Sequence, residues 1–315
     1  MESLMRAVRA LILLVCLSSA TSAQQKVDEF TQQKQPKTKT GIGKVKLTGT
    51  QVTDVEYASV GEHKLLLDLY LPKNPQGSPL VVWIHGGGWY QHSKSKIFIS
   101  WLSNYGFTVA SINYRLVDVA TWPAQLHDCK GAVRWLRAHA DQYGYNAERI
   151  VISGASAGGH LAALMGTTGG VRSLEGDVGG NLDQSSRVQA VVDYYGATDF
   201  ILRSKTQPSR ANKEGSVVYN LLGGGADQLK RIARQASAKY HVTKDDPPML
   251  VFHGEQDNTV LIDQSEAIVK AYQEAGLPIT FHRIPTGSHG GFVYYSGKNA
   301  QHLYWFARKY TSLPK

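Results

Sequence analysis

The sequence predicts an α/β protein in which helices flank a mostly parallel central sheet. Unbroken apolar runs recur along the chain, and amphipathic helical patterns lie between them. Such runs are typical of parallel strands buried on both faces, and their alternation with helices indicates a doubly wound sheet. The predicted strands of this kind are 80–84, 108–112, 150–152, 188–195, 249–252 and 279–284.

Local patterns predict the remaining elements of the sheet domain. The β-rich runs 52–58 and 64–71 flank a Gly-containing turn, which predicts an antiparallel hairpin. Between residues 123 and 141, apolar side chains recur at helical spacing, and a second helix is predicted near 263–275. The apolar positions of the first helix are Leu126, Cys129, Val133, Leu136 and Ala140, with Lys130, Arg134 and Arg137 on its other faces.

Residues 199–240 break this alternation of strands and helices. They are polar, contain three consecutive glycines at 223–225, and include a helical pattern near 227–239. We predict that they form a small cap inserted into a single domain spanning 51–315. About 290 residues remain after the N-terminal segment described next, enough for one large core.

The N-terminus has the three parts of a secretory signal peptide. Arg6 and Arg9 precede the short apolar run 10–17, and small residues before positions 21 or 24 offer a cleavage site. We therefore predict a signal peptide over 1–23 and a secreted or periplasmic protein; an unprocessed hydrophobic helix is the alternative. No later apolar run reaches the ~20 residues of a transmembrane segment.

Charge and cysteine content narrow the function classes. The net charge is +9, and residues 24–50 hold six lysines against Asp28 and Glu29, so we predict a flexible, Lys-rich leader. It either binds an anionic wall polymer or serves only as a linker; a nucleic-acid partner is not expected of an exported chain. After removal of the predicted signal peptide, Cys129 would be the remaining cysteine, and its simplest role is that of a buried packing residue. Neither a metal nor a cofactor is expected, because no cluster has ligand spacing.

The segment GASAG at 154–158 predicts a nucleophile. It directly follows a predicted strand and precedes the helical run 161–165. In such a sharp turn the serine backbone is strained and its hydroxyl is exposed above the sheet, while glycines avoid collisions with the neighbouring strand and helix. Ser156 is therefore the candidate nucleophile; the alternative is a purely structural turn.

A histidine and a carboxylate in later loops complete the pattern. We choose His289, after the last predicted strand, as base, and Asp257, just past strand 249–252, as acid. Glu255 is the main competitor for the acid, followed by Asp199. The other histidines are not chosen as the base. His85 is expected to organise its loop, and two more lie on a helix or at a strand end, where other roles are expected. These are His160, expected to pack, and His253, at a strand end.

The segments HGGGW (85–89), GASAGGHLAALM (154–165), HGEQD (253–257) and GSHGG (287–291) resemble α/β-hydrolase esterases of the hormone-sensitive-lipase group. More narrowly, the chain resembles bacterial feruloyl and acetylxylan esterase-like (BD-FAE-like) hydrolases over about 51–311. The resemblance implies the α/β-hydrolase fold, a Ser-His-Asp triad and an acyl-enzyme. By the same resemblance, the oxyanion hole is formed by Gly87, Gly88 and Ala157. The acid loop departs from many relatives, with Val260-Leu261 instead of Val-Pro.

The implied substrates are short acyl esters, with acetyl or feruloyl esters of plant polysaccharides as the physiological expectation. Trp89, Tyr114 and Tyr195, beside the oxyanion loop or at strand ends, are candidate substrate-binding residues; ordinary packing is the alternative. The sequence does not specify acyl length, alcohol or oligomeric state. An arylformamidase or amidase of the same fold and a non-catalytic binding module are the competing functions.

Overall fold

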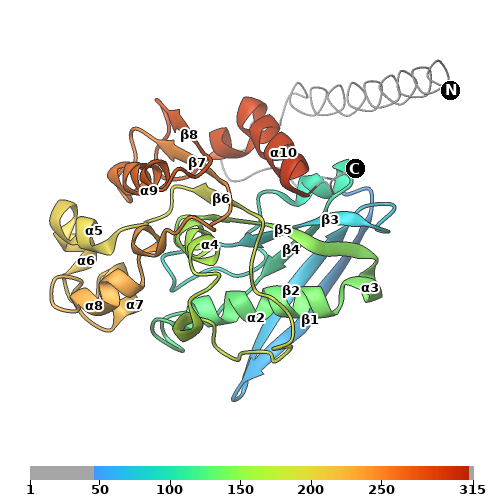
Figure 1. Ribbon diagram of the computed structural model, residues 1–315, viewed down its shortest axis with the longest axis horizontal. Coiled ribbons are helices and arrows are strands. Elements are labelled where there is room, and N and C mark those ends of the chain that lie inside the picture. Colours follow the sequence, from blue (N-terminus) through green and yellow to red (C-terminus); the bar gives the residue numbers. More distant parts are fainter. Residues whose placement is uncertain (1–45, 312–315) are drawn as a thin grey trace.

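The computed structural model describes residues 46–311 (Figure 1). The predicted signal peptide and most of the predicted leader lie outside the described residues. The last leader residues belong to the folded part, because Thr48 donates two hydrogen bonds to Asn104 Oδ1 and Thr50 already pairs with Leu71. Among the described residues, no helix is long and apolar enough to cross a membrane.

Eight strands form one sheet in the order β1-β2-β4-β3-β5-β6-β7-β8. The first two strands form the predicted antiparallel hairpin, β2 also pairs antiparallel with β4, and the remaining neighbours are parallel. The strands are β1 (Thr50–Val60), β2 (His63–Leu71), β3 (Ser78–Ile84), β4 (Thr108–Ile112), β5 (Tyr145–Ala155), β6 (Ala190–Tyr194), β7 (Met249–Gly254) and β8 (Ile279–Ile284). The predicted fold class is confirmed: this is an α/β-hydrolase fold.

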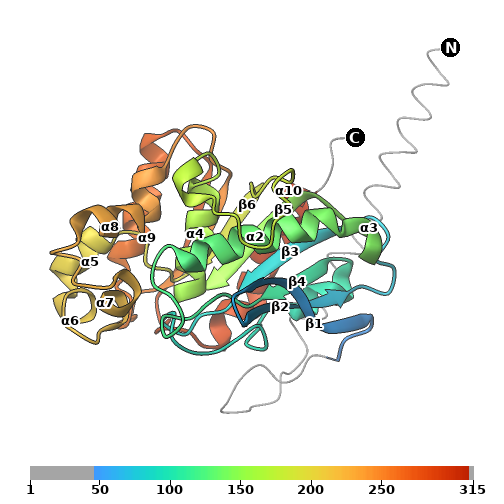
Figure 2. The same cartoon turned by 90° about the horizontal axis from the view of Figure 1, so that it is seen from below.

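Helices cover both faces of the sheet and divide the core in two. Along β3, Val82 and Ile84 point into one apolar cluster, whereas Val81 and Trp83 point into the other. The first cluster lies under α2 (Ala124–Ala138), α4 (Ala157–Thr167) and α9 (Asp263–Glu274). The second lies under η1 (Ser100–Tyr105) and α10 (Gly297–Thr311), a helix that the sequence patterns did not assign. Figure 2 shows α2 and α4 side by side over the sheet.

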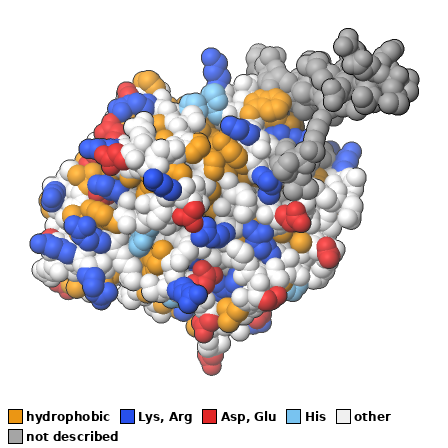
Figure 3. Space-filling view, viewed as in Figure 1, with side chains coloured by type: hydrophobic (Ala, Val, Ile, Leu, Met, Phe, Trp, Pro, Cys, Tyr) orange, Lys and Arg blue, Asp and Glu red, His pale blue; other side chains and the backbone are white. Residues whose placement is uncertain are grey.

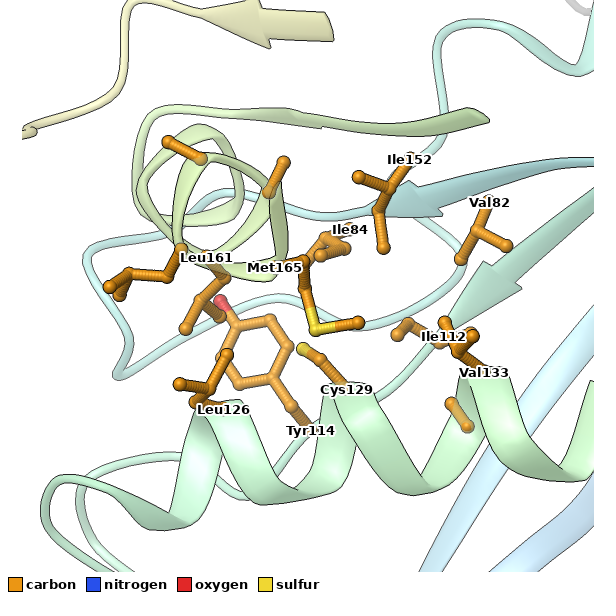
Figure 4. Packing of buried hydrophobic residues seen from close by; sticks show 14 of the residues in the cluster. Val82, Ile84, Ile112, Tyr114, Leu126, Cys129, Val133, Ile152, Leu161 and Met165 are labelled. Atoms are coloured by element: carbon orange, nitrogen blue, oxygen red, sulfur yellow. The ribbon is translucent and has the colours of Figure 1, made fainter. Parts of the chain in front are cut away.

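The apolar stripe predicted for the first helix is buried as expected. Cys129 is a free, buried thiol that lies among Leu126, Val133 and Met165 (Figure 4), so its predicted packing role is confirmed. The helix ends earlier than predicted, at Ala138, and a separate short turn, α3 (Ala140–Tyr143), follows it.

Two charged residues of α2 are also buried. Lys130 and Arg134 are both shielded from solvent, and both pair with Glu175 beyond the 3-10 turn η2 (Arg172–Leu174). The helix therefore has a second buried face, which its polar sequence pattern did not indicate. This pairing compensates the cost of removing the two cations from water.

The predicted cap is a cluster of short helices between β6 and β7, at one end of the molecule (Figure 1). It consists of α5 (Phe200–Thr206), α6 (Pro208–Ala211), α7 (Val217–Leu222), α8 (Lys230–Gln235) and η3 (Ala238–His241). The prediction of a single helix near 227–239 is wrong, because α8 and η3 are separate elements. Ser237 has an extended backbone, and its hydroxyl accepts the Phe200 N–H and donates to the Ala233 carbonyl, so α8 ends before it.

Candidate active site

Ser156 occupies the sharp turn between β5 and α4. Its backbone has φ 54° and ψ −115°, a sparsely populated conformation for a residue with a side chain. The flanking glycines are needed sterically: a Cβ on Gly154 would lie 2.2 Å from the Gly158 carbonyl oxygen, and one on Gly158 would lie 2.1 Å from the Ile84 carbonyl oxygen. The predicted collisions are therefore present.

His289 lies in the loop between β8 and the 3-10 turn η4 (Phe292–Tyr295). Its Nε2 is 2.8 Å from Ser156 Oγ, and its Nδ1 is 2.7 Å from Asp257 Oδ2. The ring packs edge-on against Tyr195, whose hydroxyl is 2.5 Å from that of Tyr295. The structure thus brings the three predicted residues into one line of hydrogen bonds.

Asp257 follows β7, and both of its carboxylate oxygens accept hydrogen bonds. Oδ1 accepts the backbone N–H groups of Thr259 and Val260, at 2.8 and 3.0 Å. Oδ2 faces His289 Nδ1 and, at 3.3 Å, His253 Nε2. Burial alone would raise the pKa of Asp257, but the hydrogen bonds from the two histidines and Val260 outweigh it and hold the pKa well below the ordinary carboxyl value. This carboxyl group is therefore ionised at neutral pH.

The competing carboxylates have other partners. Glu255 forms an exposed ion pair with Arg283 at 2.8 Å. Asp199 caps α5 by accepting the Leu202 N–H and pairs with Lys239 at 2.8 Å. Neither of them contacts His289 in the described residues.

The glycine loop after β3 lies directly against the serine turn. A Cβ on Gly86 would be 2.6 Å from the Ala155 carbonyl oxygen, and Gly87 and Gly88 adopt φ +118° and +61°. Among residues 46–311, the N–H groups of these last two glycines donate to no protein acceptor. Ala157 opens α4, so its N–H also lacks a partner within that helix. The three groups are free to bind an oxygen atom beside Ser156.

A cavity of about 320 Å³ opens beside Ser156 and His289. Trp89 and Tyr195 line it, as predicted for substrate-binding residues. The expectation for Tyr114 is wrong: its ring stacks on His85, its hydroxyl donates to the His85 carbonyl, and it is absent from the cavity wall. Sequence patterns also did not single out several wall residues, namely Lys96, Phe98, Arg203, Arg210 and Val217.

Comparison with known proteins identifies the family. The BD-FAE family model matches residues 67–272, more than half of the chain. The chain belongs to the BD-FAE family. The match includes Ser156 and Asp257 but ends before His289, whose place beside them is shown by the geometry.

Several relatives of this BD-FAE protein carry esterase names. It is 30% identical to Esterase LipC of Mycobacterium tuberculosis over 71% of this chain and 56% of that protein. It is 31% identical to a structure titled a truncated form of carbohydrate esterase from gut microbiota, with TM-score 0.76 over 84% of this chain and 96% of the other. A bifunctional GH43-CE structure from Bacteroides eggerthii matches at 32% identity and TM-score 0.76, over 83% and 35%. The chain spans about half the length of the curated relatives that it matches.

Two other histidines of the BD-FAE domain, His85 and His160, are held by structural contacts. Burial lowers the pKa of His85 and His160 to about 4, so both rings are neutral at pH 7. His85 Nδ1 donates to the Gly86 carbonyl, as expected for a residue that organises its loop. His160 lies between Trp89 and the Ala236 carbonyl, as expected for a packing residue.

His253 has a supporting position that the sequence did not reveal. Its Nδ1 is 2.7 Å from Ser265 Oγ, and its Nε2 lies 2.9 Å from the Val260 carbonyl as well as near Asp257. These contacts hold the acid loop against α9. The sequence feature that could have indicated this role is a histidine at the end of a predicted strand, four residues before Asp257.

If the Gly87 N–H binds an ester oxyanion, as the resemblance implies, Gly87→Ala in this BD-FAE protein should lower kcat/KM for ester hydrolysis by about 10²–10³-fold, the usual cost of one displaced donor. The new Cβ would lie 2.2 Å from the Gln91 carbonyl oxygen, so the loop must move. Gly106→Ala is the matched control, because Gly106 also has positive φ (+88°) but open space around it. Ester-hydrolysis kinetics check this; equal losses in the two variants would contradict it.

Proposed function

We propose that this protein is a serine ester hydrolase that works through a Ser156–His289–Asp257 triad and an acyl-enzyme. The observation that carries the proposal is the unbroken line of hydrogen bonds from the strained serine through the imidazole to an ionised carboxylate. An aliphatic hydroxyl is a poor nucleophile at neutral pH unless an adjacent base removes its proton. The imidazole at 2.8 Å is placed to do this.

In the first half-reaction, Ser156 Oγ attacks the ester carbonyl carbon while His289 Nε2 takes its proton. The carbonyl oxygen becomes negative, and the N–H groups of Gly87, Gly88 and Ala157 stabilise it. Asp257 holds the Nδ1–H tautomer and stabilises the imidazolium. The carbon–oxygen bond to the alcohol then breaks as His289 protonates the leaving oxygen.

In the second half-reaction, water replaces the alcohol. His289 takes a proton from the water as the water oxygen attacks the acyl carbon of the acyl-enzyme. The bond to Ser156 Oγ breaks, the serine regains its proton from the imidazole, and the carboxylic acid leaves. Each proton accepted by the imidazole is returned, so the enzyme emerges unchanged.

We propose acetyl or feruloyl esters of plant polysaccharides as the physiological substrates. The two solved relatives described above are titled as carbohydrate esterases, which supports a carbohydrate-linked alcohol. A cavity of about 320 Å³ has room for a small acyl group and part of a sugar. The proposed secretory signal peptide fits an extracellular polymer as substrate.

The experiment that tests this function is hydrolysis of p-nitrophenyl acetate, methyl ferulate and acetylxylan by the purified protein. We expect turnover of p-nitrophenyl acetate and of at least one of the two plant-type esters. No hydrolysis of any of the three would refute the proposed function, whereas activity on p-nitrophenyl acetate alone would refute only the plant-polysaccharide assignment.

The acid side of the pH profile should report the imidazole rather than the carboxylate. Because the pKa of Asp257 is held far below its ordinary value, this group stays charged as the solution is acidified. Catalysis needs a neutral base to accept the Ser156 proton, so a loss of kcat/KM between pH 8 and pH 4 would be attributed to that base and not to Asp257. Measurement from pH 4 to 8 checks this, and a flat profile would require a different base.

A further inference from the structure

The Lys and Arg residues that line the candidate active-site cavity are not balanced by acidic residues in its wall. Its wall includes the cationic side chains of Lys96, Arg203 and Arg210, and no Asp or Glu residue lines it. Lys96 approaches from the loop after β3, whereas the two arginines approach from α5 and α6 of the cap. A cavity for neutral esters does not need cations on two of its walls.

Arg203 is the most informative of these residues because it is only 2% exposed. Its Nε donates to Gln207 Oε1 at 3.2 Å and its Nη2 to the Thr259 carbonyl at 2.8 Å. Within residues 46–311, no carboxylate lies at ion-pair distance from it, and its Nη1 has no hydrogen-bond partner. A buried cation without a counter-ion is costly, and an anion in the cavity would offset that cost.

Arg210 adds a second positive charge to the same wall. Burial and the charge of Arg210 lower the pKa of Arg203 to about 10, although Asp257 and Asp263 act in the opposite direction. Arg203 therefore still carries its charge at neutral pH. Arg210 is exposed and, among the described residues, forms no ion pair. Two unpaired guanidinium groups can share one carboxylate through charge-assisted hydrogen bonds.

The cap around these arginines is positively charged as a whole. Residues 199–241 contain eight Lys or Arg residues against three Asp or Glu residues, a larger excess than the rest of the sheet domain contributes. Figure 3 shows the blue side chains gathered over α5–α8, at the left end of the molecule. Such a field raises the association rate of anionic ligands at low ionic strength.

We propose that this cavity selects esters that carry a carboxylate group in their acyl or alcohol part, bound by Arg203 and Arg210. The inference rests on the proposed ester-hydrolase function and narrows its substrate class to acidic esters. Within carbohydrates, such a carboxylate belongs to a uronic acid; within acyl groups, it belongs to the half-ester of a dicarboxylic acid. The competing role for Arg203 is positional: its bond to the Thr259 carbonyl would only hold the acid loop.

Two matched substrate pairs test the proposal and distinguish the two sources of the carboxylate. The acyl pair is mono-p-nitrophenyl glutarate and p-nitrophenyl butyrate; the alcohol pair is an acetylated methyl galacturonoside and the corresponding acetylated methyl galactoside. We expect the acidic member of one pair to have at least tenfold higher kcat/KM. We also expect that preference to decrease as salt is raised from 20 to 500 mM.

Three variants then assign the preference to its residues. Arg210→Gln should lower the acidic-to-neutral ratio of kcat/KM about tenfold, and Arg203→Gln about 10–100-fold, as expected for a lost charge-assisted bond. Arg203→Lys should restore part of the ratio. The control is Arg231→Gln, an exposed cap arginine outside the cavity wall, which should leave the ratio unchanged.

The outcomes separate this inference from the proposed function. Hydrolysis of both neutral esters with no preference for either acidic partner overturns the anionic-substrate inference and leaves the ester hydrolase intact. Equal losses on acidic and neutral esters in Arg203→Gln, with no change of the ratio in Arg210→Gln, would assign Arg203 to positioning and also overturn it. Inactivity on all four substrates and on p-nitrophenyl acetate would remove the proposed function itself.

Discussion

Ser156→Ala is expected to reduce kcat for p-nitrophenyl acetate by about 10⁶-fold, the scale of nucleophile loss in triad enzymes. The substitution removes only Oγ, the atom that lies 2.8 Å from His289 Nε2. The β-carbon and the backbone bonds from Ser156 N–H to Tyr194 and from His160 N–H to the Ser156 carbonyl remain. The fold should therefore be retained, and the residual rate should come from the oxyanion donors alone.

Ser153→Ala is the matched control for this loss. Ser153 lies three residues earlier on β5, is fully buried, and its hydroxyl has no hydrogen-bond partner in the described residues. Removing that hydroxyl should leave the rate unchanged. A fluorophosphonate probe should label the wild type and the Ser153 variant but not the Ser156 variant. Equal labelling of all three proteins, or none of the wild type, would favour a non-catalytic binding module.

The residues of the serine turn could be predicted because their constraints are local. Gly154, Ser156 and Gly158 act within one strand-to-helix connection, where each close approach involves backbone atoms that the motif itself supplies. His289 and Asp257 were found by position, since each follows a strand whose end lies at the same edge of a parallel sheet. Residues that directly follow such strands therefore lie close together at that edge of the sheet.

Residues whose position depends on distant partners could not be predicted in this way. Tyr114 follows a strand as a pocket residue would, yet stacking on His85 turns it into the core. Arg203 lies in the polar segment 199–240, where no sequence pattern distinguishes it from an exposed residue. Its contact with Thr259, 56 residues away, accompanies its burial beside the cavity. Lys130 and Arg134 were likewise placed on the polar faces of their helix. Their burial depends on ion pairs with Glu175, which is distant in the sequence.

The fold shows the same division between local and distant causes. Strands in the sheet interior were recognised because unbroken apolar sequence is sufficient for burial on two faces. The helix expected near 227–239 failed because Ser237 bonds Phe200 N–H, a partner 37 residues earlier in the chain. The helix α10 was not assigned, although its buried residues Ala300, Leu303, Tyr304 and Ala307 recur at helical spacing.

Asp257→Asn is expected to lower kcat by about 10⁴-fold, as removal of the acid's charge does in other triads. An asparagine carbonyl oxygen would keep the bonds from Thr259 and Val260, which leaves its amide group facing His289. That amide donates instead of accepting, so Nδ1 must become the acceptor and Nε2 must carry the proton. Nε2, the atom that faces Ser156, then has no lone pair to take the serine proton, and the imidazolium also loses its stabilising charge.

Glu255→Gln is the matched control, because Glu255 is the competing carboxylate two residues away. It pairs with Arg283 in an exposed ion pair of the kind that contributes at most about 1 kcal/mol to stability. We therefore expect kcat within about twofold of the wild type, measured on p-nitrophenyl acetate with unfolding transitions recorded in parallel. A large loss in the Glu255 variant with a small one in the Asp257 variant would reverse the assignment. A loss in Asp257→Asn that accompanies unfolding would mean that the hydrogen bonds of Asp257 to its own loop, rather than its charge beside the imidazole, account for the effect.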